Sequence, residues 1–138
     1  MAKRYFETDI EVDYLDTDAM GHVSAPVYYA YMLRTYLKFM HELLQMPLPQ
    51  KLPHIMIKTA CEYLHPARYG DVIKVASSVT HLGSKSFALD YLMTLPRQSE
   101  TVLAKASSTH VMFDYAANAT TPMTDDFKQR VMSFQGAL

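Results

Sequence analysis

The sequence of 138 residues has little of what several protein classes require. It contains one cysteine, Cys61, four glycines and no tryptophan. A single cysteine excludes an internal disulfide and a CxxC redox or metal motif, and so few glycines argue against a fibrous or disordered chain. No apolar run approaches the roughly 18 to 20 residues of a membrane helix. We therefore expect one folded domain over residues 1–138, without a membrane span.

The chain also lacks an excess of either charge. Thirteen basic residues stand against fourteen acidic ones, which leaves a net charge of -1. Such a balance provides no global field for DNA, RNA or an anionic membrane, and we expect neither nucleic acid nor membrane as a partner. The first residues reach an acid at Glu7 before a signal-peptide core could form, so we expect a cytoplasmic protein.

What the chain does have is alternation of apolar and polar residues, which is typical of strands. Between residues 4 and 14, one side carries Phe6, Ile10 and Val12, and the other carries mainly acids. Similar patterns bounded by turn residues predict further strands over residues 55–64, 72–82, 86–95 and 101–115. The last three of these follow one another closely, which indicates an antiparallel meander.

The period changes to that of a helix between Pro26, suited to a first helical turn, and about Gln45. Two sets of side chains follow this helix: a wide apolar stripe of Tyr28, Met32, Tyr36, Phe39 and Leu43, and a side of Val27, Tyr31, Arg34 and Lys38. A short final helix is expected from Thr124, whose hydroxyl can cap it. The fold class is therefore α+β, with one long helix against a mainly antiparallel sheet of about five strands. Two free sheet edges favour a homo-oligomer.

The densest group of reactive side chains is the run Asp16-Thr17-Asp18-Ala19-Met20-Gly21-His22. It falls between the first strand and the long helix, so carboxylates and an imidazole meet the free N–H groups of a helix start. Those N–H groups can stabilise an oxyanion, and a carboxylate can attack a carbonyl or activate a water. The combination is typical of acyl transfer to water.

The same run, continued by Val23 and followed by Tyr28, resembles the D-x-D-x-x-G-H-V…Y signature of hotdog-fold acyl-CoA thioesterases, the group typified by 4-hydroxybenzoyl-CoA thioesterase. Two later blocks resemble turns of that family: His65-Pro66-Ala67-Arg68-Tyr69-Gly70-Asp71 its P-x-x-x-G-D turn, and Leu82-Gly83-Ser84-Lys85-Ser86-Phe87 its L-G-x-x-S-F turn. The resemblance covers the chain from about Lys3 to Asp114, with the elements in the family's order.

The resemblance implies a hotdog fold, dimers that join their sheets edge to edge, and often tetramers, with active sites at the dimer interface. It assigns the catalytic carboxylate to Asp18 and the N–H that polarises the thioester carbonyl to Ala25. His22 is the third candidate catalytic residue, and Tyr28 is expected to line the acyl pocket. Coenzyme A is expected to cross the partner subunit near the turn of Ser84, Lys85 and Ser86, where a lysine and N–H groups suit a phosphate. Neither a cofactor nor a metal is implied.

Two departures from the family pattern concern the substrate class. Many relatives continue their Gly-His-Val with two asparagines, whereas this chain has Ser24-Ala25-Pro26. Many also carry an acid one turn further along the helix, where this chain has Leu33 and Arg34. Three alternatives therefore stand beside an acyl-CoA thioesterase: an acyl-carrier-protein thioesterase, a hotdog dehydratase or hydratase, and a protein that binds an acyl group or CoA without turnover.

Each candidate also has a structural interpretation. Asp18 could simply form an Asx-turn or cap the helix, Asp16 is expected to shape the loop through backbone hydrogen bonds, and His22 either orients water or substrate or forms a wall of the pocket. His65 is interpreted as shaping the turn before Pro66. Arg68 and Lys105 are weaker phosphate candidates than Lys85.

The histidines lack the ligand spacing of a zinc site, and GxSxG, GxGxxG and GxxxxGK motifs are absent from the sequence, which argues against serine hydrolases, dinucleotide binding and P-loops.

Overall fold

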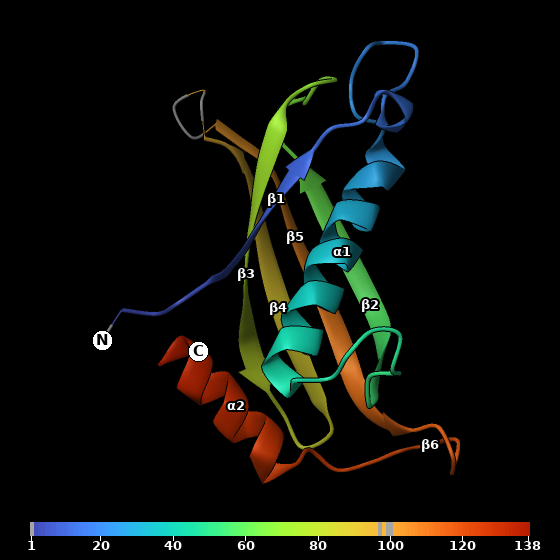
Figure 1. Cartoon of the computed structure of the whole chain (residues 1–138), viewed down its shortest axis with the longest axis vertical. Helices are drawn as coiled ribbons and strands as arrows, with labels where there is room; N and C mark the ends of the chain where they lie inside the picture. Colours follow the sequence, from blue (N-terminus) through green and yellow to red (C-terminus); the bar gives the residue numbers. More distant parts are fainter. Residues whose placement is uncertain (1, 97, 99–100) are drawn as a thin grey trace.

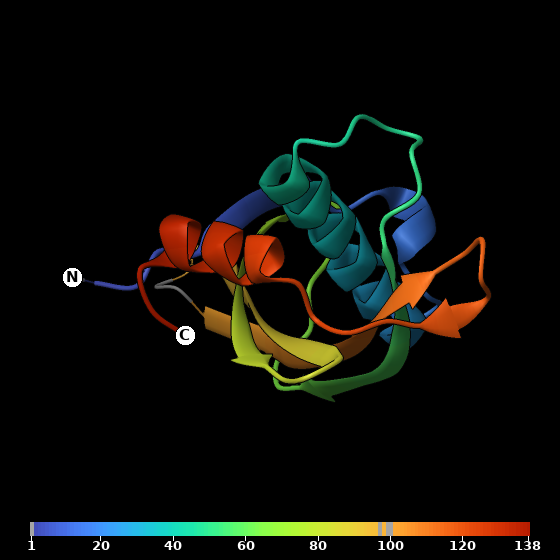
Figure 2. The same ribbon diagram turned by 90° about the horizontal axis from the view of Figure 1, so that it is seen from below.

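The computed structural model describes residues 2–96, 98 and 101–138. One antiparallel sheet forms a layer that curves around the long helix, and a second helix lies beside that layer (Figures 1 and 2). In chain order the elements are β1 (Phe6–Glu11), the 3-10 turn η1 (Tyr14–Asp16), α1 (Ala25–Leu44), β2 (His54–Tyr63), β3 (Val72–Leu82), β4 (Ser86–Leu95), β5 (Thr101–Asp114), β6 (Ala119–Thr120) and α2 (Asp125–Gln135).

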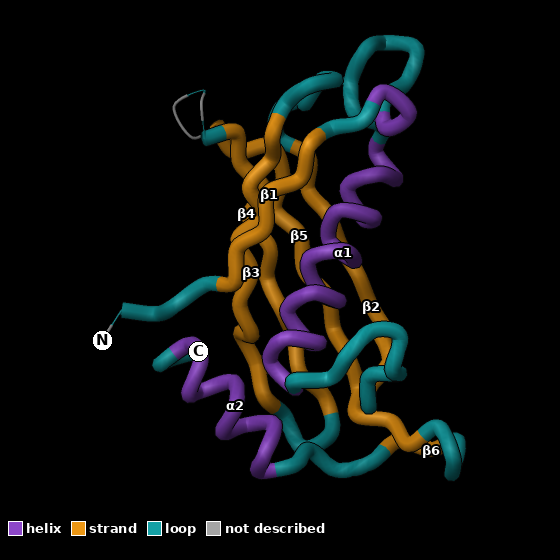
Figure 3. The backbone as a smooth tube through the Cα atoms, viewed as in Figure 1, coloured by secondary structure: helices purple, strands orange, loops and turns teal. Residues whose placement is uncertain are grey.

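The strand order in the sheet is β1-β3-β4-β5-β2, with the two-residue β6 paired to β5. All of these pairings are antiparallel. The predicted meander is therefore confirmed as β3, β4 and β5, and the predicted α+β class and hotdog fold are confirmed as well. Figure 3 shows that the loops collect at the two ends of the sheet, so side chains from different loops can meet only at one end or the other.

Helix α1 lies against the concave face of the sheet (Figure 2), and seven of its residues are buried. Tyr28, Met32, Tyr36 and Phe39 of the predicted apolar stripe are all buried. Tyr31, which the pattern places outside that stripe, is buried as well and only 1% exposed. The phenol tolerates burial because its hydroxyl donates a hydrogen bond to Asp16 Oδ2 at 2.8 Å, and that partner lies outside the helix.

The first strand is shorter than the alternation predicts. Pairing with β3 covers only Phe6 to Glu11, although the alternating pattern runs on to Tyr14. Beyond β1, the Asp13 N–H donates to Asp16 Oδ2 at 3.0 Å and closes the 3-10 turn, so Tyr14 is 67% exposed instead of facing the core. The predicted cap of the final helix is confirmed, since the Phe127 N–H donates to Thr124 Oγ1 at 3.1 Å.

Two hydrogen-bonded groups of polar side chains lie in the core under α1. Tyr36 Oη lies 2.7 Å from His54 Nδ1, while Ser108 Oγ lies 2.7 Å from both His110 Nε2 and Tyr91 Oη. Burial lowers the pKa of His54 to about 3 and that of His110 to about 4. Both imidazoles are therefore neutral inside the folded protein at physiological pH.

No helix in the part of the chain that the structure describes is long and apolar enough to cross a lipid bilayer.

Candidate active site

The loop between β1 and α1 is held by its own backbone and by Asp16. The Ser24 N–H donates to the Asp16 carbonyl at 3.0 Å, and the Asp18 N–H donates to the His22 carbonyl at 2.8 Å. Thr17 and Val23 form an isolated antiparallel bridge across the loop. Asp16 thus has the structural role expected from the sequence, because its carboxylate also accepts the bonds from Asp13 and Tyr31 described above.

Asp18 lies at the tip of this loop with an exposed side chain. Its Oδ1 accepts a hydrogen bond from the Met20 N–H at 2.9 Å and a longer one from the His22 N–H at 3.4 Å. The Asx-turn considered from the sequence is therefore present. Because the turn uses Oδ1, it orients the carboxylate and leaves Oδ2 as the oxygen that can act on a ligand. A turn-forming role and a chemical role are compatible in this geometry.

A cleft of about 320 Å³ lies in front of Asp18, at the start of α1. It brings together four of the residues predicted from the sequence, namely Asp18, His22, Ala25 and Tyr28. In the first turn of α1, Pro26 carries no N–H, and the Val27 N–H donates to the Ser24 carbonyl at 3.0 Å. Of Ala25, Pro26 and Val27, Ala25 is therefore the residue whose N–H can meet a carbonyl oxygen in the cleft.

The cleft is also lined by residues that were not assigned to the site from the sequence. They come from the end of β2 and the turn after it: Tyr63, Leu64, His65 and Pro66. The lengths of α1 and β2 are the signal by which these residues could have been found. Twenty residues of helix rise about 30 Å, and the ten residues of β2 return about 33 Å, so the end of β2 lies level with the start of α1. The Tyr63 hydroxyl accordingly donates to the Ala25 carbonyl at 3.0 Å.

The two tyrosines of the cleft are hydrogen-bond donors rather than bases. Their rings meet edge to face with centroids 5.2 Å apart. Burial raises the pKa of Tyr28 above its ordinary value of 10, and loss of hydration raises that of Tyr63 to about 12. Both phenols therefore keep their protons at neutral pH. The proton acceptors of the cleft are the carboxylate and the imidazoles.

The predicted coenzyme A turn lies elsewhere in the chain. Ser84, Lys85 and Ser86 connect β3 to β4 at the end of the sheet far from the start of α1 (Figure 1). The Lys85 carbonyl accepts from the Met112 N–H at 2.8 Å, and the Ser84 carbonyl accepts from the Met123 N–H at 2.7 Å. One chain therefore does not bring this turn to the Asp18 cleft. Its proposed role requires a second copy of the chain.

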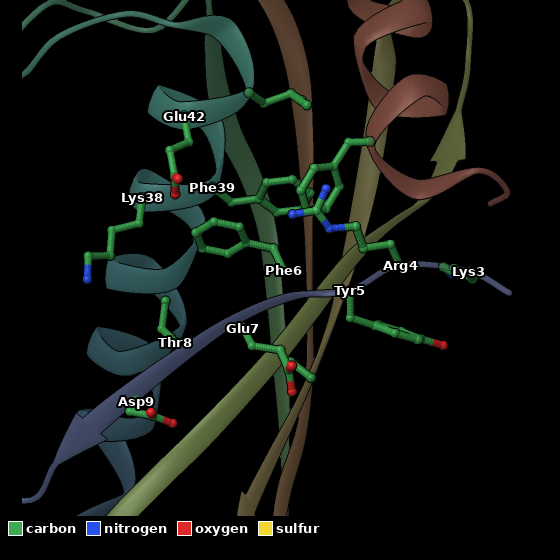
Figure 4. Close-up of a pocket in the computed structure, with 13 residues that line it drawn as sticks. Lys3, Arg4, Tyr5, Phe6, Glu7, Thr8, Asp9, Lys38, Phe39 and Glu42 are labelled. Carbon is green, nitrogen blue, oxygen red and sulfur yellow. The ribbon is translucent and has the colours of Figure 1, made fainter.

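A larger hollow, of about 1000 Å³, runs between β1, α1 and α2 (Figure 4). Its side chains engage one another: Phe6 stacks on Phe39 at 4.8 Å, and the Arg4 guanidinium lies 4.2 Å above the Phe134 ring. Figure 4 shows Lys38 and Glu42 on the α1 side of this groove. It contains none of the motif residues, so its size does not make it the active site. Within the described residues, no cluster of three or more His, Cys, Asp or Glu side chains could hold a metal ion.

Comparison with solved structures supports the fold over nearly the whole chain. A predicted thioesterase from Bacillus stearothermophilus matches with a TM-score of 0.84 and 17% identity, covering 95% of this chain and 96% of that one. A 1,4-dihydroxy-2-naphthoyl-CoA thioesterase from Synechocystis, Slr0204, matches with a TM-score of 0.78 and 19% identity over 93% and 96% of the two chains. A thioesterase from Thermus thermophilus, complexed with coenzyme A and zinc, gives a TM-score of 0.82 and 19% identity over 96% and 95%.

No curated protein matches the chain significantly. The sequence model of the thioesterase-like superfamily, in contrast, matches residues 12–131. That span includes the Asp18 loop, the cleft and both predicted family turns. The chain therefore belongs to the thioesterase-like superfamily and is a thioester hydrolase with the hotdog fold.

Proposed function

We propose that the chain hydrolyses acyl-CoA thioesters in the Asp18 cleft and acts as a cytoplasmic homodimer or homotetramer. The observation that carries the proposal is that Asp18 and Ala25, from a loop and a helix start, line one cleft. Coenzyme A as the acyl carrier is supported by the names of two structural relatives, one acting on a naphthoyl-CoA ester and one complexed with coenzyme A.

In the proposed reaction the thioester carbonyl lies between Asp18 and the start of α1. Asp18 Oδ2 either attacks the carbonyl carbon, giving a mixed anhydride that water then cleaves, or takes a proton from a water that attacks instead. The Ala25 N–H stabilises the oxyanion. The C–S bond breaks and the thiolate leaves without a dedicated acid, because a thiol has a pKa of only about 8.5.

Pairing with a second copy of the chain would bring the predicted coenzyme A turn to the cleft. Strand β2 is an edge of the sheet, and Ile57 and Tyr63 on it are 56% and 44% exposed. Antiparallel pairing of two β2 edges reverses one copy relative to the other. The partner's β3–β4 turn, with its Ser84, Lys85 and Ser86, would then lie at the level of the Asp18 cleft.

The test is thiol release from a panel of short, long, branched and aromatic acyl-CoAs by wild type, Asp18→Asn and Asp114→Asn. The amide oxygen introduced by Asp18→Asn can still accept the Met20 bond, so the loop is retained. Asp114 is a matched control, because its Oδ1 also accepts two backbone N–H bonds, from Ala116 and Ala117 at 2.9 and 3.2 Å. We expect Asp18→Asn to lose about 10²-fold or more in rate and Asp114→Asn to keep it.

Full turnover by Asp18→Asn would refute the assignment of Asp18. The alternatives make different predictions for the wild type. Turnover of acyl carrier protein esters, without turnover of CoA esters, would identify the carrier-protein thioesterase. Binding of CoA esters without hydrolysis of either kind would identify a binding protein.

A further inference from the structure

His65 lines the Asp18 cleft but belongs to none of the motif positions on which the proposed function rests. It lies just beyond β2, which ends at Tyr63, and directly before Pro66. Its Nδ1 lies 2.9 Å from the Val102 carbonyl oxygen of β5. A carbonyl oxygen only accepts hydrogen bonds, so Nδ1 must carry the proton of the neutral ring. This bond fixes both the tautomer and the ring orientation, and gives Nε2 the lone pair of the neutral ring.

That lone pair adds a second proton acceptor to the cleft. Both residues line the cleft, Asp18 with a carboxylate from the loop before α1 and His65 with an imidazole from the segment after β2. A ligand held between them has to supply two hydrogen-bond donors. Water does so with its two hydrogens, and holding both of them aims its oxygen lone pair away from the acceptors.

We propose that His65 is a further catalytic residue, whose Nε2 takes the proton of the hydrolytic water. That water attacks the thioester carbonyl while Asp18 holds its other hydrogen, or it attacks the mixed anhydride that Asp18 has formed in an earlier step. In this step the water O–H bond breaks as the new C–O bond forms. The proton passes to Nε2 and gives an imidazolium whose Nδ1–H remains bonded to Val102. The inference rests on the proposed function, since it assigns the proton of that same hydrolysis.

General chemistry favours an imidazole for this task. Proton acceptors work best when their pKa lies near the operating pH, and histidine is the side chain whose ordinary pKa of about 6.5 meets that condition. The groups that line the cleft around His65 are Asp18 and His22 from the loop, Tyr28 from α1 and Tyr63 from β2, while β5 contributes the Val102 carbonyl. His22 is the competing imidazole, and no bond within the described part of the chain fixes its tautomer as Val102 fixes that of His65.

The first test compares His65→Asn, His22→Asn and His41→Asn. The amide that His65→Asn introduces can still donate to Val102, so this variant removes Nε2 while keeping the anchor. His41 is the matched control: its Nδ1 lies 2.9 Å from the Met46 carbonyl, at the far end of α1. On the best acyl-CoA substrate we expect His65→Asn to lose about 10²-fold in kcat and to lose the rise in rate with pH that a general base gives. His41→Asn should keep the wild-type rate and profile, and His22→Asn should keep the rise in rate with pH.

The second test is chemical rescue, because the cleft is open to solvent. Added imidazole should restore the rate of His65→Ala by about tenfold or more and restore nothing in Asp18→Ala. Wild-type kcat and pH profile in His65→Asn would overturn the role of His65 alone, as would loss of the pH-dependent rise in His22→Asn. A wild-type protein that hydrolyses no thioester would instead overturn the proposed function, and the role of His65 with it.

Discussion

The buried Tyr31 hydroxyl donates a 2.8 Å hydrogen bond to Asp16, two residues before the candidate catalytic Asp18. Helix α1 and the loop are thus joined by a bond to a carboxylate, which contributes about 1.5 to 3 kcal/mol. The same Asp16 oxygen accepts the Asp13 N–H, and the Asp16 carbonyl accepts the Ser24 N–H. Asp16 therefore connects the helix, the 3-10 turn and the loop that carries the carboxylate.

Removing the Tyr31 hydroxyl should disturb the reaction more than the fold. We expect Tyr31→Phe to lower kcat about tenfold, because the loop then holds Asp18 less firmly. Tyr36→Phe is the control on the same helix: it removes a buried hydroxyl bonded to His54, away from the loop. Steady-state kinetics and urea unfolding should show lost stability in both variants but lost kcat in Tyr31→Phe alone. Equal kcat values for the two variants would contradict a positioning role.

Gln135 completes the edge of β3 beyond the first residue of β1, which pairs with Ser77. Its Oε1 accepts the Val79 N–H at 2.6 Å, and its Nε2 donates to the Val79 carbonyl at 3.0 Å. Both residues are buried, so Gln135→Ala leaves a donor and an acceptor unpaired and should cost about 2 to 4 kcal/mol. Gln129→Ala, on the exposed face of the same helix, should stay within about 0.5 kcal/mol of wild type. Urea unfolding of the two variants distinguishes this strand-capping role from a general sensitivity of α2 to substitution.

Stability should fall as the pH drops through the weakly acidic range. His54 and His110 have folded pKa values of about 3 and 4, lowered by burial from an ordinary 6.5. Between the folded and the ordinary values the unfolded chain binds more protons than the folded one, so stability is fully present above about pH 6.5 and decreases below it. Each histidine contributes a slope of up to about 1.4 kcal/mol per pH unit.

The measurement is urea unfolding between about pH 5 and 7.5 at one protein concentration, so that any oligomer equilibrium is held constant. His110→Phe is the matched variant. It keeps the aromatic stack with Tyr36 and Phe87 and leaves Ser108 bonded to Tyr91. Its slope between about pH 5 and 6 should be smaller than that of wild type by up to about 1.4 kcal/mol per pH unit. Parallel stability curves for the two proteins would contradict burial of a neutral His110.

Local patterns predicted the elements well wherever turn residues bound them. Strands 72–82 and 86–95 have the observed bounds, because Gly83 and Pro96 interrupt the alternation. The first strand was extended too far, since alternation cannot reveal that Asp16 turns the chain at Asp13. The burial of Tyr31, outside the predicted stripe, depends in the same way on a partner that lies outside the helix.

The site, too, combines residues that a local pattern reveals with residues that only the folded structure brings in. Asp18, His22, Ala25 and Tyr28 lie within eleven consecutive residues, so one motif could bring them together in one cleft. Tyr63 and His65 reach that cleft only through the return of β2 along α1, which is a property of the packed layers. The hydrogen bond that makes His65 a proton acceptor depends on Val102, far along the chain. Such a contact leaves no mark in the local sequence.

Replacing Lys85 should weaken the binding of the coenzyme A part of the substrate and leave the binding of the acyl group unchanged. Its exposed lysine is predicted to meet a phosphate of the coenzyme A bound across a second copy of the chain. Losing a contact worth about 1 kcal/mol should raise the KM for acyl-CoA about fivefold in Lys85→Ala, with kcat unchanged. The matched substrate is the acyl-pantetheine thioester, which carries the same acyl group and thiol arm without phosphates, so its KM should be the same for both proteins. A change in KM for both substrates would mean that the substitution disturbs the fold or the subunit contact, and no change for either would remove Lys85 from the binding site.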